Sequence, residues 1–384
     1  MKSLLPSIGF FVFATIAADP NPPAAPGWTM QTSGSTARLR GVSAVSEKVA
    51  WASGSANTVL RTVDGGATWT RLTPPGETAT APLDFRDIDA IDARTAYVLS
   101  IGEGTASRIY KTTDAGARWT LQFTNQDPRG FYDAMTFWDA EHGLVIGDSI
   151  DGHFQILITA DGGTTWAKVP DRALPPALPN EGAFAASGSN IAVVGLDHAW
   201  IGTGAGTKSR VLHTGDRGKT WTVVETPVAA SGSAGIFSVA FRDSNHGVIV
   251  GGDYQQEKAA VANVAITSDG GRTWTLVKEQ GLSGFRSAVK YVPGTRRSLI
   301  TVGPQGADTS ADDGRSWTPL AGPAPLPGFD ALSFAPGVKV AWASGKDGAL
   351  ARLDVVRTEQ TTNERLREKI AREGVTVFPI PVGH

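Results

Sequence analysis

Four side chains of this sequence could perform acid–base chemistry. Glu181, Asp133 and Asp87 are carboxylic acids near the starts of predicted strands, and Tyr132 precedes Asp133. Hydrolysis of a glycosidic bond needs two carboxyl groups about 5–10 Å apart. Glu181 with Asp133 or Asp87 is therefore the candidate catalytic pair, and Tyr132 is a further catalytic candidate.

A second group of residues could bind an anionic ligand. Arg40, Arg86 and Arg286 each stand near the start of a predicted strand, and a guanidinium can hold a carboxylate or phosphate through two parallel hydrogen bonds. The remaining candidates for ligand binding are Asp330, Asp148, His153, Asp253 and Tyr254. Charges at strand ends also pair with one another, so a solvated, salt-bridged rim is the alternative interpretation.

The composition argues against several other kinds of site. The chain has no cysteine, which excludes disulfides, thiolate metal sites and cysteine nucleophiles. Its histidines show no metal-ligand spacing, and Asp148 with Asp151 offers too few carboxylates for calcium. No glycine-rich turn joins a parallel strand to a helix, and the formal net charge is -2. We therefore expect no metal, no cofactor and no nucleic-acid partner.

A repeated turn indicates the scaffold that positions these candidates. The segment Thr62–Trp69 is the first of six related copies, each with an Asp two residues before a Gly and five before a Trp. Such an Asp can accept hydrogen bonds from nearby backbone N–H groups while the Gly adopts a positive φ, as in a tight hairpin. The six aspartates are Asp64, Asp114, Asp161, Asp216, Asp269 and Asp312. We expect all six to be structural.

The interval between these turns predicts an all-β propeller. Successive copies lie about 50 residues apart, and short segments of alternating apolar residues fill the intervals. Each interval supplies four antiparallel strands, which make one blade. In the first blade we expect strands at Leu39–Val45, Lys48–Gly54 and Val59–Val63, followed by a strand from Thr68.

The two ends of the repeat region predict how the ring closes. Lys339–Gly345 repeats the KVAWASG letters of Lys48–Gly54, but no turn motif follows it. Trp28–Gln31 has the pattern of an outer strand without a blade of its own. Pairing it with Leu350–Val355 would close a ring of seven four-stranded blades and leave no free sheet edge there.

Antiparallel alternation places the turns and the candidate site on opposite faces. In a four-stranded blade, the start of the inner strand and the loop between the second and third strands share one face. The turn motifs lie on the other face. The arginines, carboxylates, tyrosines and histidine named above as candidates should therefore converge on the central depression of one face.

The termini carry separate signals. Residues 1–18 combine Lys2, an apolar stretch too short to favour a membrane span, and small residues, as in a signal peptide. A Pro-rich linker at 19–27, the propeller at 28–356 and a tail at 357–384 follow, with a helix expected over Asn363–Glu373. The mature protein is expected to be a periplasmic or extracellular monomer without a membrane span.

The turn motif resembles the Asp-box (BNR) repeat of sialidase-like propellers. The larger pattern of strand starts, AWASG strands and VLRTVDGGATW turns is similar to the photosystem II stability/assembly factor family and its non-photosynthetic bacterial relatives. That resemblance covers about residues 28–356 and implies a non-enzymatic seven-bladed propeller that binds a protein client through an arginine patch. The matching positions are Arg40, Arg86 and Arg286. The Arg-Ile-Pro motif of sialidases is absent.

Together these features predict a secreted, non-catalytic binding or assembly propeller. Its ligand would be a protein client, an acidic glycan or another anionic group. The alternative is a carbohydrate-active enzyme, either a glycoside hydrolase or a polysaccharide lyase. A distance beyond about 10 Å between Glu181 and its nearest carboxylate, with no pocket between them, would argue against the hydrolase.

Overall fold

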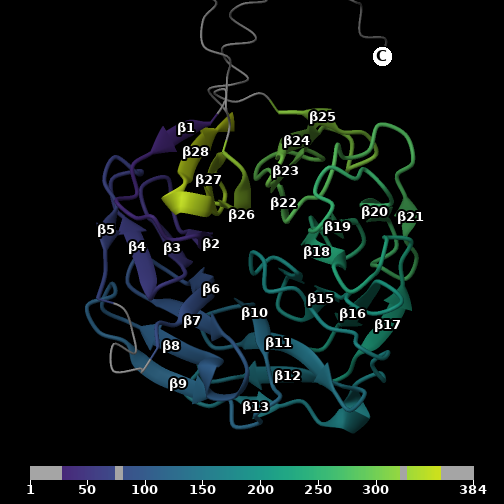
Figure 1. The fold of residues 1–384 in the computed structure, drawn as a ribbon, viewed down its shortest axis with the longest axis horizontal. Coiled ribbons are helices and arrows are strands. Elements are labelled where there is room, and N and C mark those ends of the chain that lie inside the picture. The colour runs from purple at the N-terminus through teal and green to yellow at the C-terminus, as the bar shows by residue number, and fades with distance from the viewer. Residues whose placement is uncertain (1–27, 74–80, 321–326, 356–384) are drawn as a thin grey trace, which may run out of the picture.

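Seven four-stranded antiparallel sheets form a ring in the computed structural model (Figure 1). The structure describes residues 28–73, 81–320 and 327–355. Within these ranges every regular element is a β-strand or a single turn of 3₁₀ helix. The chain is a seven-bladed β-propeller, and the sequence-based prediction of this fold is confirmed.

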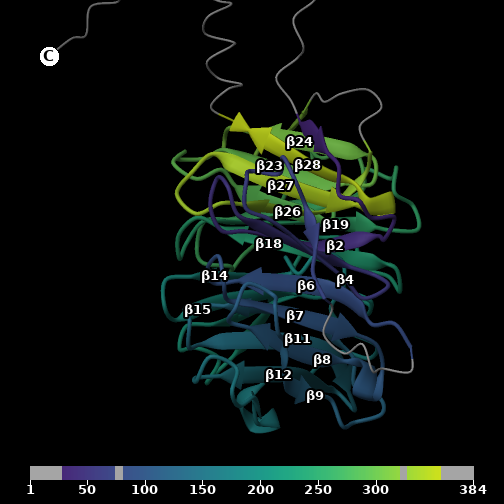
Figure 2. The same ribbon diagram turned by 90° about the vertical axis from the view of Figure 1, so that its left-hand side faces the viewer.

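In each blade the first strand lies toward the centre of the ring and the last lies at its rim (Figure 1). Blade 1 contains β2 (Leu39–Ala44), β3 (Ala50–Gly54), β4 (Thr58–Thr62) and β5 (Thr70–Arg71), and blade 2 contains β6 (Asp84–Ala90), β7 (Ala96–Ile101), β8 (Arg108–Thr112) and β9 (Thr120–Thr124). Blade 3 contains β10 (Tyr132–Phe137), β11 (Gly143–Ile150), β12 (His153–Thr159) and β13 (Ala167–Lys168). In the view turned by 90°, strands of blades 2 and 3 lie side by side (Figure 2).

The other blades repeat this order. Blade 4 contains β14 (Ile191–Val194), β15 (His198–Gly202), β16 (Arg210–Thr214) and β17 (Thr222–Glu225), and blade 5 contains β18 (Ala234–Phe241), β19 (Gly247–Asp253), β20 (Val264–Thr267) and β21 (Thr275–Leu276). Blade 6 contains β22 (Ala288–Tyr291), β23 (Leu299–Gly303), β24 (Gly306–Ser310) and β25 (Thr318–Pro319). Blade 7 contains β26 (Phe329–Phe334), β27 (Val340–Gly345), β28 (Leu350–Asp354) and β1 (Thr29–Gln31). The 3₁₀ turns are η1 (Gly104–Ala106), η2 (Asp171–Ala173) and η3 (Lys346–Gly348).

Blade 7 combines strands from both ends of the described chain. Its strand order is β1-β28-β27-β26, so the N-terminal strand lies outermost. Thr29 lies opposite Arg352 in antiparallel register. Trp28 is 4 % exposed, and its ring centroid is 5.3 Å from that of Phe329 on the inner strand. Because β28 has a hydrogen-bonded neighbour on each side, this blade is as complete as the other six.

The repeated turn has the same backbone hydrogen bonds in all six copies. In the first copy Thr62 Oγ1 accepts from the N–H of Gly66 at 2.9 Å, and Asp64 Oδ1 accepts from the N–H of Thr68 at 2.9 Å. The corresponding pair of bonds occurs in each of the other five turns. Gly66 has a φ of 87°, where a residue with a Cβ would be strained. The carboxylate is thus used within its own turn.

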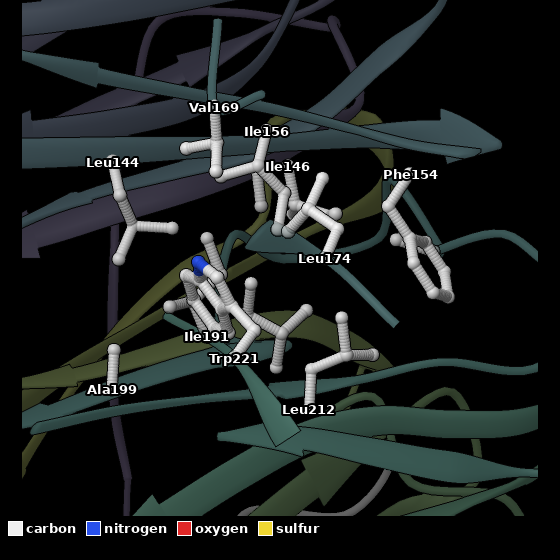
Figure 3. Close-up of a cluster of buried hydrophobic side chains, with 13 residues drawn as sticks. Leu144, Ile146, Phe154, Ile156, Val169, Leu174, Ile191, Ala199, Leu212 and Trp221 are labelled. Atoms are coloured by element: carbon white, nitrogen blue, oxygen red, sulfur yellow. The ribbon is translucent and has the colours of Figure 1, made fainter. Parts of the chain in front are cut away.

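Neighbouring blades pack through apolar side chains. Both faces of a blade are covered, so second strands such as Ala50–Gly54 are buried along their whole length. Trp51, Trp200 and Trp342 on these strands are fully buried. Figure 3 shows the cluster between blades 3 and 4, where Trp221 packs with residues of both blades: Leu144, Ile146, Phe154, Ile156, Ile191 and Leu212.

Three predictions concern other parts of the chain. The predicted signal peptide at 1–18, the predicted linker at 19–27 and the predicted helix at 363–373 lie outside the described residues. In the part of the chain that is described, no helix has the length and apolar character needed to cross a membrane.

Candidate functional site

All seven blades contribute to one pocket on the face opposite the repeated turns. Its volume is about 570 Å³. The wall is made by residues at the starts of inner strands and by the loops that join second to third strands. Its charged and aromatic residues are Arg38, Arg40, Arg86, Phe131, Asp133, Asp148, Phe184, Phe237, Tyr254, Glu257, Phe285, Asp330 and Lys346.

A backbone irregularity repeated in five blades builds much of this wall. The register between inner and second strand shifts near the start of the inner strand in blades 1, 2, 3, 5 and 7. The residues left out of the ladders are Arg40, Arg86, Asp133, Phe237 and Asp330. All five line the pocket. A β-bulge re-aims the side chain of its extra residue, so one scaffold feature presents a different side chain from each blade.

Arg38, Arg40 and Asp330 form a basic side of the pocket. Arg38 donates to both carboxylate oxygens of Asp330, each at 2.8 Å. Nε of Arg40 is 3.9 Å from that carboxylate and makes no hydrogen bond. Burial lowers the pKa of Arg40 to about 10, which still leaves it charged at neutral pH. The side chain of Arg40 is 16 % exposed, so its charged guanidinium could hold an anionic group of a ligand.

Arg86 links blade 2 to the segment that leads into blade 4. Its Nε donates to Asp84 Oδ2 at 3.0 Å, and Nη1 donates to the carbonyl of Ala185 at 2.7 Å. These bonds orient the guanidinium along the pocket wall, where it lies partly exposed. Arg86 thus adds a further positive charge to a pocket that Arg38, Arg40 and Lys346 also line.

Asp133 and Asp148 bring two carboxyl groups together in the same pocket. Asp133 is 2 % exposed, and its Oδ2 has no hydrogen-bond partner. Asp148 Oδ1 accepts from the N–H of Ala183 at 3.1 Å. Burial, reinforced by the neighbouring Asp148, raises the pKa of Asp133 well above its usual range. Burial raises the pKa of Asp148 to about 6. Paired carboxyl groups with raised pKa values can act as an acid–base pair or attract a cation.

An aromatic cluster forms another part of the wall. The rings of Phe184 and Phe237 are stacked, with centroids 4.0 Å apart and planes 12° apart. Phe285 meets Phe237 edge-on at 4.6 Å. Tyr254 lies 6.3 Å from Phe184 and is 45 % exposed, so its ring extends the apolar surface toward solvent. This cluster can cover the apolar part of a ligand.

Two predicted site residues lie in buried ion pairs away from the pocket wall. Glu181 is 1 % exposed, and its Oε1 accepts from Arg210 Nε at 2.9 Å and from the Thr203 hydroxyl at 2.6 Å. Arg286 is buried and donates from Nε to Asp308 at 2.7 Å. Because their charges are already compensated, neither group is free to meet a substrate. This geometry does not support Glu181 as a catalytic carboxylate or Arg286 as a ligand-binding arginine.

Tyr132 and Asp87 also lie outside the pocket. Tyr132 is buried edge-on against Phe123, with ring centroids 5.5 Å apart, and burial raises its pKa to about 12. Asp87 lines a separate cavity of about 100 Å³ together with Asp89 and Lys290 on the inner strands. Burial raises the pKa of Asp87 to about 7. The structure therefore separates Asp87 and Tyr132 from Asp133, with which the sequence grouped them.

The two remaining candidates lie away from the pocket wall. His153 is exposed and lies 3.8 Å from Asp171. Asp253 accepts from the N–H of Gln255 at 2.9 Å within its own turn. Among the described residues, no group of three or more potential ligands is arranged to hold a metal ion. The pocket thus combines Arg40, Arg86, Asp133, Asp148, Tyr254 and Asp330 of the predicted set.

Sequence reasoning missed Arg38 and the phenylalanines of the wall. Phe237 occupies the bulge position that Arg86 and Asp133 occupy in their blades, so an alignment of inner strands could have identified it. Phe184 belongs to the segment before blade 4, which has no counterpart in the other blades. No repeat-based signal could have placed it.

Several solved structures share this architecture. The structure described as YCF48 bound to D1 peptide matches with a TM-score of 0.62 and 16% identity, over 88% of this chain and 99% of that chain. YCF48 from Cyanidioschyzon merolae matches with a TM-score of 0.58 and 17% identity, over 85% of this chain and 99% of that one. What they share is the propeller fold.

An enzyme also has this fold. The GH74 xyloglucanase from Xanthomonas campestris matches with a TM-score of 0.57 and 17% identity, over 85% of this chain and 53% of that chain. No protein-family model and no curated protein matches the sequence. At these identities the similarity establishes the fold and leaves function to the residues of the pocket.

Proposed function

We propose that this protein is a non-catalytic binding or assembly propeller that holds a segment of a protein partner in its central pocket. The observation that carries the proposal is Arg40, whose side chain is 16 % exposed in the pocket wall and whose guanidinium makes no hydrogen bond to the described residues. A charged guanidinium without a hydrogen-bonded acceptor can hold an anionic group of a ligand. A carboxylate on the partner would supply that acceptor.

The rest of the pocket suits a peptide segment. The stacked Phe184 and Phe237 offer an apolar surface beside the arginines, and Tyr254 extends it to the rim. Aromatic and arginine side chains commonly anchor protein–protein contacts. A peptide bound to YCF48, which has the same fold, supports this choice of ligand class.

We further propose that the partner is met outside the cytoplasm. Residues 1–18 have the composition of a signal peptide. Fusion of residues 1–27 to a reporter that is active only after export would test this proposal. Activity of the fusion that is lost when charged residues replace the apolar stretch is the expected result, and an inactive fusion would contradict export.

The binding proposal is tested by capture from an envelope extract of the source cell. The wild type and an Arg40→Ala/Arg86→Ala variant serve as baits, and the bound proteins are identified by mass spectrometry. Arg217→Ala is the matched control, because Arg217 lies in a repeated turn on the opposite face.

The same partner should be recovered with the wild type and with Arg217→Ala. The double variant should recover it at least about tenfold less, because it lacks the guanidinium groups of both Arg40 and Arg86 in the pocket wall. Equal recovery by a folded double variant would refute the assignment of the pocket as the binding site.

A carbohydrate-active enzyme is the second candidate, and the Asp133–Asp148 pair favours it. Two neighbouring carboxyl groups with raised pKa values in an open pocket could serve as acid and base. Incubation with neutral and acidic oligosaccharides, followed by a reducing-end assay, distinguishes the two functions. We expect no turnover; turnover that disappears in Asp148→Asn would establish the enzyme instead.

A further inference from the structure

We propose that Asp148, with Asp133 behind it, forms a subsite for a cationic side chain, a lysine or an arginine, of the bound segment. The inference rests on the proposed binding function and specifies a feature that the partner must carry. It concerns the acidic part of the pocket, whereas the proposed function rests on Arg40.

Among the described residues, no cation forms an ion pair with Asp133 or Asp148, although the charge of Arg86 acts on Asp133 from a longer distance. Asp148 uses Oδ1 to accept from Ala183, and its Oδ2 has no hydrogen-bond partner among the described residues. Asp133 Oδ2 is also without a partner, although Asp133 is 2 % exposed. The neighbouring Arg86 is held by Asp84 and by a backbone carbonyl. The buried Asp133 and the partly exposed Asp148 therefore lie together without a paired cation, and a ligand cation would stabilise their charged forms.

Two phenylalanines lie near Asp148 along the chain or across a hydrogen bond. The N–H of Asp148 donates to the carbonyl of Phe131 at 3.0 Å, and Phe131 directly precedes the adjacent strand β10. On the other side Asp148 is bonded to Ala183, which directly precedes Phe184. Both rings are partly exposed and line the same pocket as the carboxylate. A carboxylate in a pocket that is also lined by aromatic rings suits a lysine or arginine, since such rings can cover the aliphatic stem and attract the cation.

The backbone around Asp148 is adapted to this arrangement. A Cβ on Gly182 would lie 2.0 Å from Asp148 Oδ1. Only glycine therefore allows the chain to approach the carboxylate so closely, and this approach lets Ala183 donate its hydrogen bond. The carboxylate is fixed in direction, and the subsite is formed before a ligand arrives.

The position of the subsite defines the partner further. Arg40 and Asp148 belong to the same pocket, so one bound segment can meet both. The segment would carry an acidic group for Arg40, an apolar residue for the Phe184–Phe237 surface and a basic residue for Asp148. This is a mixed-charge peptide, and a purely acidic ligand would leave Asp148 uncompensated.

The test uses three short peptides and the intact protein. Acetyl-Gly-Lys-Gly-amide and acetyl-Gly-Arg-Gly-amide carry the cation, and acetyl-Gly-norleucine-Gly-amide has a similar stem without charge. Binding is followed by protein-detected NMR titration at pH 7.5. The variants are Asp148→Asn and the control Asp253→Asn, which removes a carboxylate on the same face outside the pocket.

We expect saturable binding of the lysine or the arginine peptide, with the norleucine peptide at least about tenfold weaker. Asp148→Asn should abolish this difference, and Asp253→Asn should preserve it. Equal binding of charged and neutral peptides, no saturation by either cationic peptide, or unchanged selectivity in Asp148→Asn would each refute the subsite.

The captured partner separates this inference from the proposed function. If Asp148→Asn recovers the partner as well as the wild type while Arg40→Ala/Arg86→Ala does not, the binding function stands and the cationic subsite is wrong. If both variants recover it fully, the binding function itself fails.

Discussion

The two faces of the propeller use aspartate in opposite ways. On the turn face, Asp64 is exposed, and hydrogen bonds from the hydroxyl and backbone N–H of Thr68 lower its pKa to about 2. On the pocket face, Asp133 is buried with an unpaired oxygen, and burial raises its pKa. The first carboxylate completes its own turn, whereas the second is incomplete without a ligand. The contrast separates residues that build the ring from residues available to bind.

The backbone shows the same difference. The turn face repeats one hydrogen-bonded unit six times with little variation. The pocket face repeats only the β-bulge, and the bulged residue changes from arginine to aspartate to phenylalanine between blades. The repeated β-bulge thus fixes the direction of the bulged side chain. Because the residue type at that position differs between blades, the pocket is lined by basic, acidic and aromatic side chains.

The largest expected effect comes from the scaffold that both faces share. Trp221→Ala should lower the free energy of unfolding by about 3–5 kcal/mol, because Trp221 fills the space between blades 3 and 4. Chemical denaturation followed by circular dichroism measures the change. A loss below about 1 kcal/mol would show that the blades close over the cavity.

A smaller loss of stability is expected when Glu181, which is paired with Arg210, is replaced. Glu181→Gln should destabilise the fold by about 3 kcal/mol, since Arg210 would keep its buried charge without a counter-ion. Binding of the partner should not change. If Glu181→Gln weakened partner capture in a folded protein, the division between paired and available carboxylates would be wrong.

Titration of Asp148 and Asp133 should change the affinity for the lysine peptide by a moderate factor. Burial raises the pKa of Asp148 to about 6, so its charged form, which holds a cation, becomes populated as pH rises through that value. Binding of the lysine peptide should therefore strengthen by up to about tenfold between about pH 5 and 7. The raised pKa of Asp133 should extend the rise to higher pH.

The control for this pH profile is Asp148→Asn, which should lack the rise centred near the pKa of Asp148. The other charged groups that line the pocket are Arg38, Arg40, Arg86, Glu257, Asp330 and Lys346. A profile that kept its midpoint in Asp148→Asn would assign the titration to one of these groups or to Asp133.

Much of the scaffold could be predicted because it depends on local, repeated chemistry. The spacing of Asp, Gly and Trp identified the turns, and the alternation of apolar residues between them identified the strands. The recurrence of KVAWASG near both ends indicated a seventh blade. Each of these signals is contained in a short segment, so no long-range packing had to be known.

The site was predicted less completely because its chemistry depends on partners far away in sequence. Arg286 and Arg40 occupy similar positions, but Asp308 neutralises only Arg286. Glu181 is not available to a ligand because it forms an ion pair with Arg210, which lies on β16 of the following blade. Phe184 reaches the pocket through a segment found in one blade only. Whether a charge is free or paired is a property of tertiary contacts, which the strand pattern does not encode.

The smallest expected effect on stability is that of replacing one turn aspartate, Asp64. The contribution of Asp64 to stability should depend on pH. Hydrogen bonds from Thr68 lower the pKa of Asp64 to about 2 in the folded state, against about 3.9 for an unfolded Asp. Its ionised form is therefore favoured by folding, and its contribution is complete above about pH 4 and lost as pH falls toward 2.

Asp64→Asn should lower the melting temperature slightly at pH 7, since Asp64 is exposed and solvent screens its interactions. The difference from the wild type should shrink as the pH is lowered through the folded pKa, because the wild-type carboxyl is then protonated as well. Partner capture by Asp64→Asn at pH 7 should equal that of the wild type. A folded Asp64→Asn protein that failed to bind would mean that the turn face, and not the pocket face, meets the partner.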